Sequence, residues 1–222
     1  MHLVLFDVDG TLIDSQHMIT AAMGRAFAAR GLPAPTRGET LGVVGLSLDV
    51  AMARLLGRPE IDDEARALSN AYKEAFFDLR TSSDHQEPLY PGAREVLDAL
   101  AARDDVLLGL ATGKSMRGVR AILDLHDLHG RFVTIQTADG NPSKPHPGMI
   151  LAALAATAVE PRRAVIVGDT TFDVEMAAAA GIAAVGVGWG YHAETALDRA
   201  GAVRVLDRFD QLIPTLDDLF DW

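Results

Sequence analysis

The sequence contains no cysteine. Disulfides, thiolate nucleophiles and cysteine-ligated zinc or iron–sulfur sites are therefore excluded, and any metal ion must be held by oxygen or imidazole ligands. The seven histidines are scattered, without two at ligand spacing on one helix, so a histidine-based zinc site is not expected. His146 and His192 are candidates for substrate contacts, with surface or packing roles as the simpler interpretation.

Positive charge is scarce, because 20 Lys and Arg residues stand against 31 Asp and Glu residues, a net charge of -11. The field of such a chain repels nucleic-acid phosphates and anionic lipids, so neither a nucleic acid nor a membrane is an expected partner. The same field repels a small phosphorylated metabolite. Any phosphate site must therefore carry its own positive charge, from a bound cation or a buried lysine.

Long apolar runs are missing as well. The longest, from Met176 to Trp189, is mostly Ala and Gly and too short to span a bilayer. The first residues reach Asp7 without the basic start and apolar stretch of a signal peptide. We expect a cytoplasmic protein, and nothing in the sequence indicates its oligomeric state.

From about residue 90 onward, short apolar runs alternate with stretches of helical period. This alternation predicts an α/β fold, a doubly wound parallel sheet with helices on both faces and chemistry at the carboxyl ends of the strands. The predicted strands are Leu3 to Phe6, Val106 to Ala111, Phe132 to Gln136, Ala164 to Val167, Ala183 to Val187 and Val203 to Leu206. The predicted helices between them are Ala93 to Arg103, Arg117 to Leu125, Met149 to Ala156 and Phe172 to Ala180.

Residues 15–86 break this rhythm, because they are helical in pattern and contain no convincing strand. The predicted helices here are Met18 to Arg30, Leu48 to Leu56 and Ile61 to Leu79. We therefore predict a small all-helical cap at 15–86, inserted after the first strand of a catalytic core formed by 1–14 and 87–222. The predicted hinges are Ile13 to Ser15 and Thr81 to Gln86, and the insert would cover the strand end as a lid does.

Two aspartates follow the first predicted strand, in Asp7-Val8-Asp9-Gly10-Thr11. Carboxylates at positions i and i+2 point toward the same space once the chain turns at the glycine. The plainer alternative is that both cap the next element.

Three later segments add polar groups, each with a plainer alternative. Thr112-Gly113 follows the second strand and could be a simple turn. Lys144, between Ser and Pro, could be a solvated loop charge. Asp169 and Asp173 could serve as N-terminal charges of the following helix.

Taken in order along the whole chain, these segments resemble the haloacid dehalogenase superfamily, whose phosphatase members open with the Asp-x-Asp-Gly-Thr pattern. The helical insert resembles the cap of the phosphoglycolate phosphatase-like members. The resemblance implies that Asp7 is the nucleophile and Asp9 the general acid and base. It also assigns phosphate binding to Thr112, Gly113 and Lys144, and an acidic metal-binding motif to Asp169 and Asp173.

The residue chemistry agrees with this resemblance. A carboxylate about 4 Å from a phosphate oxygen meets roughly 4 kcal/mol of repulsion at an effective dielectric near 20, so cations are needed. The candidate ligands for Mg²⁺ are Asp7, Asp9 and Asp169, with Asp173 as a further acid behind them and Lys144 as a fixed positive charge. The predicted reaction is Mg²⁺-dependent hydrolysis of a small, phosphoglycolate-like monoester through a phospho-aspartate.

Alternative functions stay open. Dehalogenating members of the superfamily lack the second aspartate, so Asp9 favours phosphate chemistry. A sugar-phosphate mutase resembling β-phosphoglucomutase and a pyrophosphatase are the enzymatic alternatives. A signalling receiver also phosphorylates an aspartate, but such modules are much shorter. Phosphonatase-type members depend on a cap lysine, whereas Lys73 is more simply interpreted as solvated.

Two loops need separate comment. Gly113-Lys114-Ser115 imitates the end of a P-loop, but Leu108 stands where the first glycine of that motif belongs. In the predicted cap, the loop from Gly42 to Ser47 precedes a helix, so Ser47 is a candidate substrate contact with a helix-capping alternative.

Overall fold

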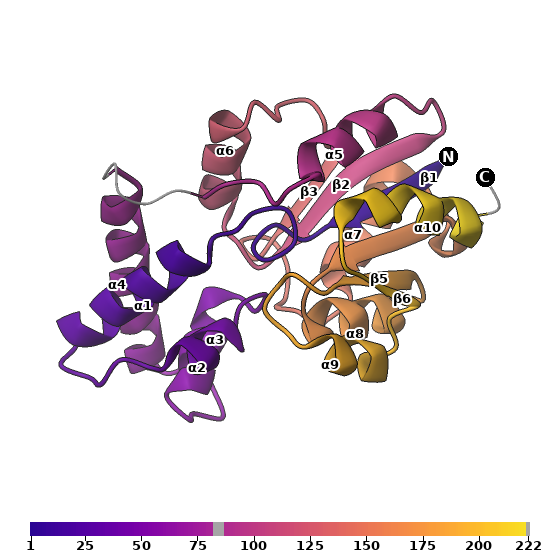
Figure 1. Cartoon of the computed structure of the whole chain (residues 1–222). Helices are drawn as coiled ribbons and strands as arrows, with labels where there is room; N and C mark the ends of the chain where they lie inside the picture. The colour runs from indigo at the N-terminus through magenta and orange to yellow at the C-terminus, as the bar shows by residue number, and fades with distance from the viewer. Residues whose placement is uncertain (82–86, 221–222) are drawn as a thin grey trace.

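A computed structural model describes residues 1–81 and 87–220 of the chain. Within these residues six strands form one sheet in the order β3-β2-β1-β4-β5-β6, and every pairing is parallel (Figure 1). The strands are β1 (His2–Phe6), β2 (Val106–Thr112), β3 (Thr134–Thr137), β4 (Ala164–Gly168), β5 (Ala183–Val187) and β6 (Arg204–Leu206). The predicted α/β fold with a parallel sheet is confirmed.

Both faces of the sheet are covered, as the alternation of side chains along each strand requires. The core helices are α5 (Ala93–Ala101), α6 (Met116–Leu125), α7 (Gly148–Thr157), α8 (Thr171–Ala180), α9 (Glu194–Ala200) and α10 (Leu212–Phe220), with short 3₁₀ turns at Pro161–Arg163 and Phe209–Gln211. In β1, Val4 and Phe6 join the apolar cluster beneath α5, α6 and α10, whereas Leu3 and Leu5 join the cluster beneath α7 and α8.

The strand order reverses at β1, which pairs with β2 on one side and β4 on the other. In open parallel sheets a crevice forms at such a switch point, outside the carboxyl ends of the two strands. Asp7 follows β1 and Asp169 follows β4 directly. The topology alone therefore brings these two aspartates to the same crevice.

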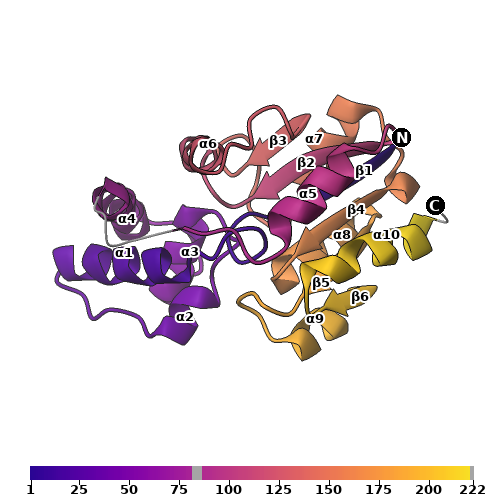
Figure 2. The same cartoon turned by 45° about the horizontal axis from the view of Figure 1, so that its top comes forward.

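Helices α1 to α4 lie together beyond this crevice (Figures 1 and 2). They are α1 (Gln16–Ala29), α2 (Arg37–Leu41), α3 (Leu48–Leu55) and α4 (Asp63–Thr81), and they bury apolar clusters of their own. Helix α2 was not predicted, although a capping box formed by Thr36 and Glu39 marks its start. Residues 82–86 of the second predicted hinge lie outside the described residues, and the boundaries of the cap stay a prediction.

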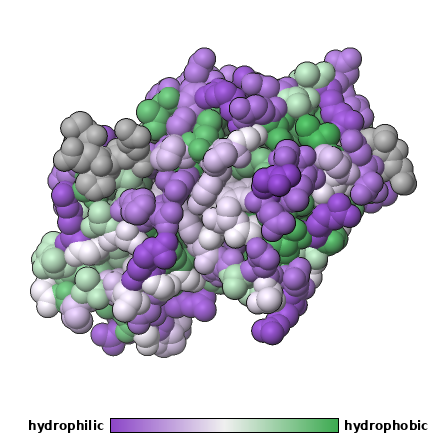
Figure 3. Space-filling model, in the orientation of Figure 1, coloured by the Kyte–Doolittle hydropathy of each residue, from purple (hydrophilic) through white to green (hydrophobic). Residues whose placement is uncertain are grey.

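The visible surface carries both hydrophilic and hydrophobic side chains (Figure 3). In Figure 3 hydrophilic side chains are interspersed with smaller hydrophobic areas over the visible face. No described helix is both long and apolar enough to cross a membrane.

Candidate active site

Asp7 lies at the end of β1 with its side chain 1% exposed. Its backbone N–H donates to Val167 O of β4 at 3.0 Å, which fixes the residue between the two strands. The ammonium Nζ of Lys144 stands 3.1 Å from Asp7 Oδ1, yet neither carboxylate oxygen accepts a well-aligned hydrogen bond from a described residue. Burial raises the pKa of Asp7 to about 6, nearby Asp173 adds to the rise, and Lys144 opposes it.

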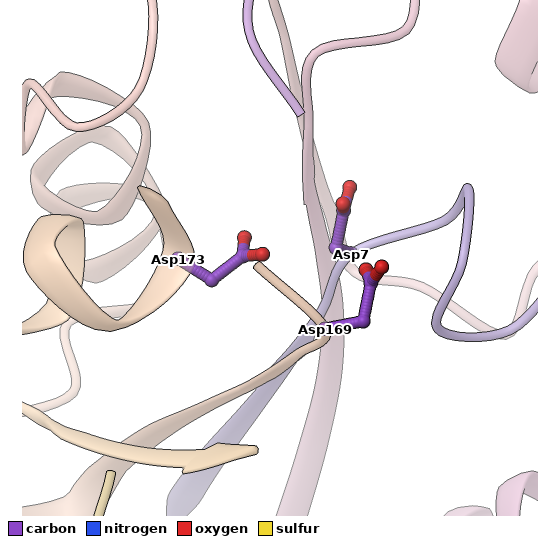
Figure 4. Close-up of side chains that lie close together, drawn as sticks. All are labelled: Asp7, Asp169 and Asp173. Atoms are coloured by element: carbon purple, nitrogen blue, oxygen red, sulfur yellow. The ribbon is translucent and has the colours of Figure 1, made fainter. Parts of the chain in front are cut away.

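Two further acids share this crevice. Oxygens of Asp7, Asp169 and Asp173 lie within 4.8 Å of one another, and Figure 4 shows the three carboxylates gathered at the end of β1. Asp169 accepts hydrogen bonds from Thr11 Oγ1 at 3.0 Å and from the N–H of Tyr191 at 2.9 Å. Burial, and then the charges of Asp7 and Asp173, raise the pKa of Asp169 well above its ordinary value.

A glycine lets the loop after β1 close against Asp169. Gly10 has φ +89, in the left-handed region, and a Cβ placed there would lie 2.2 Å from Asp169 Oδ2. A side chain at this position would displace the carboxylate. Gly10 is therefore required for two reasons: the left-handed backbone of the turn and the close approach of the Asp169 carboxylate.

Lys144 is the counter-charge of the cluster, and its side chain is 0% exposed. Its Nζ donates to Asp173 Oδ1 at 2.6 Å. Burial alone lowers the pKa of a lysine, but the Asp173 and Asp7 carboxylates outweigh it and raise the pKa of Lys144. The other oxygen of Asp173 accepts from Thr170 N at 3.2 Å and Thr170 Oγ1 at 2.7 Å as part of a helix-capping box. Asp173 thus caps α8, as the plainer interpretation of the sequence has it, and also holds Lys144, a contact that was not predicted.

Three buried carboxylates against one ammonium leave an excess of negative charge, and both Asp7 oxygens lack a hydrogen-bonding partner among the described residues. Such a group costs several kcal/mol of desolvation unless a cation or a proton compensates it. Carboxylate oxygens are the ligands that hard divalent cations prefer, so the residues present fit Mg²⁺.

Asp9 does not join these three acids. Both of its oxygens accept from Lys114 Nζ, at 2.7 and 2.9 Å, and Oδ1 also accepts from Ser15 Oγ at 2.6 Å. Asp9 was predicted as a metal ligand together with Asp7 and Asp169; its carboxylate lies outside the group that Asp7 and Asp169 form with Asp173, and its role toward a metal stays a prediction. In the sequence Lys114 stands out only as part of an incomplete P-loop motif, and its contact with Asp9 was not predicted. The available signal was a lysine two residues beyond a threonine at a strand end.

Thr112 and Gly113 lie where the second strand meets the predicted cap. Thr112 is the last residue of β2, and its Oγ1 accepts from the N–H of Lys114 at 3.2 Å. A Cβ on Gly113 would lie 2.5 Å from Gly45 O, so only glycine lets the loop at 42–47 approach this closely. From that loop, the N–H of Ser47 donates to Ser143 Oγ at 2.8 Å.

A cavity of about 550 Å³ opens between α1–α4 and the sheet. Asp7, Asp9, Thr112, Gly113 and Ser47 all line it. Lys73, interpreted from the sequence as solvated, is exposed and lines it too. Much of the wall facing the sheet is apolar: Ile19, Met23, Val43, Val44, Leu46, Ile61, Phe76 and Phe77.

The two histidines singled out from the sequence do not line this cavity. His146 Nδ1 accepts from the N–H of Gly148 at 3.1 Å, and His192 Nδ1 accepts from the N–H of Thr171 at 3.1 Å. The His192 ring also packs edge-on against Phe172. The contacts of both histidines are those of loop and packing residues.

Comparisons with known proteins agree with this geometry. Residues 4–187 match the family described as haloacid dehalogenase-like hydrolase. The chain is 34% identical over 215 residues to "Probable phosphatase IndB" of Dickeya dadantii, covering 95% of this chain and 91% of the relative. It is 30% identical over 231 residues to "Phosphoglycolate phosphatase" of Escherichia coli K12, covering 96% and 91%.

Solved structures are similar over nearly the whole chain. The crystal structure of a hydrolase from Pseudomonas syringae superposes with a TM-score of 0.86 at 27% identity, covering 98% of this chain and 99% of that one. A structure titled putative beta-phosphoglucomutase, from Bacteroides vulgatus, superposes with a TM-score of 0.81 at 23% identity, covering 100% and 91%. At that identity the second likeness concerns the fold alone.

Proposed function

The chain belongs to the haloacid dehalogenase-like hydrolase family and is a phosphatase, and from this premise we propose that it hydrolyses small, phosphoglycolate-like monoesters with Mg²⁺ as cofactor, through a phospho-aspartate on Asp7. The observation that carries the proposal is the buried group of Asp7, Asp169 and Asp173 around Lys144, with the oxygens of Asp7 left without hydrogen bonds from described residues. A carboxylate in this state is free to act as a nucleophile.

Each residue has a definite task in the proposed reaction. Mg²⁺ bound at the carboxylates would offset the repulsion between Asp7 and the phosphate. Lys144 adds a fixed charge, and the Thr112 hydroxyl and the Gly113 N–H bind the phosphate oxygens. Asp7 attacks the phosphorus, the bond to the ester oxygen breaks, and Asp9 gives that oxygen a proton. Asp9, then ionised, takes a proton from the water that attacks the phospho-aspartate, which releases phosphate and restores Asp7.

A turnover screen tests this proposal. Two-carbon acid phosphates, sugar phosphates, nucleotides and pyrophosphate are offered to the folded protein with Mg²⁺ and, in parallel, with a chelator. We expect repeated release of phosphate from at least one small monoester with Mg²⁺ and none with the chelator. Folded protein that releases phosphate from none of these compounds would contradict the proposal.

A sugar-phosphate mutase is the second candidate, favoured by the cavity of about 550 Å³, which lies in the range of ligand pockets and has room for a phosphorylated hexose. The two reactions differ in the acceptor of the phosphoryl group. A phosphatase releases phosphate from a hexose phosphate, whereas a mutase returns an isomer. The signalling-receiver alternative is set aside, because the chain belongs to a hydrolase family.

Asp169→Asn tests the metal site. Without metal, the variant should be more stable than the wild type by about 1–2 kcal/mol, because one buried charge is removed while an amide still fits between Thr11 and the Tyr191 N–H. Added Mg²⁺ should raise the melting temperature of the wild type but not of the variant, and turnover should fall at least about 100-fold. Asp104→Asn, at an exposed position, is the matched control. An equal Mg²⁺ shift in Asp169→Asn and wild type would remove Asp169 from the ligands.

Ser47→Ala tests the predicted cap contact. The Ser47 hydroxyl makes no capping hydrogen bond to α3 although it lines the cavity, so it is available to a substrate. The variant should raise KM for the true substrate about tenfold, the value of one hydrogen bond, and spare a small generic ester. Ser143→Ala removes the acceptor of the Ser47 N–H instead and should affect both esters alike. Equal KM effects of Ser47→Ala on the two esters would refute the substrate role.

A further inference from the structure

Lys114 is a largely buried lysine in the wall of the cavity, and the proposed reaction does not use it. Its side chain is 9% exposed, and Nζ donates to Asp9 Oδ1 at 2.7 Å and to Oδ2 at 2.9 Å. Lysines are seldom buried unless they are paired, so this bidentate contact accounts for the position of the ammonium. The only other side-chain hydrogen bond to Asp9 found among the described residues comes from Ser15 Oγ, on Oδ1.

The pair belongs to a larger charge network. Lys114 Nζ also lies 3.6 Å from Glu87 Oε1, and the Glu87 side chain is 3% exposed. Glu87 Oε2 accepts from Arg80 Nε at 2.7 Å and lies 2.6 Å from Arg80 Nη2. Arg80 stands in the last turn of α4, so Glu87 and Lys114 connect this helix to Asp9 through successive ion pairs.

An aromatic ring of α4 completes the surroundings of Lys114. The ammonium stands 5.2 Å from the centre of the Phe76 ring, and the Arg80 guanidinium stands 5.0 Å from it. Cations at this distance over a ring are attracted to its face. Phe76 precedes Arg80 by one helical turn, so both belong to the same face of α4. The location of the Lys114 ammonium is therefore set by this helix as well as by the loop after β2.

We propose that Lys114 is the positioning residue of Asp9: held by Phe76 and by the Glu87–Arg80 pair, it keeps the Asp9 side chain where its carboxyl group, when it carries a proton, meets the leaving oxygen of the substrate. Without Lys114 the carboxylate keeps the Ser15 bond alone and can turn away from the leaving oxygen. The inference rests on the acid role of Asp9 in the proposed function. It adds a dependence of that role on the placement of α4.

The test compares two esters by kcat/KM, which covers the steps up to cleavage of the ester bond. An alkyl phosphate needs a proton on its leaving oxygen, whereas p-nitrophenyl phosphate leaves as a stable anion and needs little help. Lys114→Met should lower kcat/KM for the alkyl ester about 30- to 100-fold, mainly through kcat, and for the nitrophenyl ester less than about fivefold. Lys114→Arg, which keeps a cation beside Asp9, should recover most of the loss.

Two further variants make the result decisive. Arg120→Met removes one exposed positive charge from α6, the helix that follows Lys114, and should leave kcat/KM for both esters unchanged. Phe76→Leu keeps every charge but removes the ring face, and should produce a smaller loss in the same direction. If Lys114→Met does not fold, Phe76→Leu decides the question.

A loss that is equal for the two esters, or a rise in KM alone, would overturn the positioning role. Such a result leaves the proposed function intact, because wild-type protein still hydrolyses both esters. Failure of the wild type to hydrolyse either one counts against the proposed function instead.

Discussion

Replacing Asp7 by asparagine is expected to lower turnover of every phosphate ester by at least about 10⁴-fold, the loss seen when a catalytic nucleophile is removed. The fold should survive. Burial raises the pKa of Asp7 to about 6, which means that the charged carboxylate is less favourable in the folded protein than in the unfolded chain, so the neutral amide should not lower the melting temperature. Steady-state phosphate release and thermal melting measure the two effects.

The matched control is Asp104→Asn, at an exposed position outside the cavity, which should change neither quantity. Substantial turnover in folded Asp7→Asn protein would show that another group attacks the phosphorus. The family fold would stand, but the assignment of the nucleophile would not.

Lys144→Met is expected to produce the largest loss of stability. The lysine is fully buried between Asp173, at 2.6 Å, and Asp7, at 3.1 Å, so its removal leaves three buried carboxylates without a fixed counter-charge. Breaking a buried ion pair in this way costs about 3–5 kcal/mol. For a chain of this size, the melting temperature in metal-free buffer should fall by about 10 °C. Turnover should fall with it.

A double variant separates charge from packing. In Lys144→Met with Asp173→Asn, both members of the shortest ion pair are neutral, so the double variant should be more stable than the sum of the two single changes predicts. Added Mg²⁺ should also restore part of the stability of Lys144→Met, because a cation replaces the missing charge. Additive losses and no Mg²⁺ effect would mean that Lys144 contributes packing rather than charge.

The core could be predicted from sequence because its strands are continuous apolar runs buried on both faces, which is the pattern of a parallel sheet. The runs at Val4–Phe6 and Val165–Val167 illustrate this, since successive side chains enter opposite apolar clusters. The ends of the strands and helices were predicted less accurately than their existence. The third strand was predicted from Phe132, but it begins at Thr134, although the Val133 N–H already donates to Leu108 O of β2 at 2.9 Å.

The site was predictable to the extent that topology determines it. Asp7 and Asp169 follow adjacent strands, so the switch-point rule brings them together without knowledge of any side chain. The position of Lys144 came from the family resemblance, because a lysine in a loop carries no sign of burial. The functional roles of all these residues stay predictions.

The sequence does not show which residues a long side chain contacts across the fold. Lys114 and Asp9 are 105 positions apart, and the Lys114 ammonium also lies over the ring of Phe76, from α4. Local spacing places Lys114 just beyond a strand end but does not identify Asp9 as its partner. The same holds for the contact between Asp9 and Ser15, which was not predicted either, whereas the metal-ligand role predicted for Asp9 stays a prediction.

The most direct test of the account is to trap the phosphorylated enzyme. Protein quenched in acid during turnover and then reduced with borohydride converts an aspartyl phosphate into homoserine, which mass spectrometry of the peptide spanning residues 1–14 can locate. The account predicts homoserine at position 7, formed only when substrate is present and absent from Asp7→Asn. Reduction at another aspartate, or an unmodified peptide from enzyme trapped during rapid turnover, would contradict it.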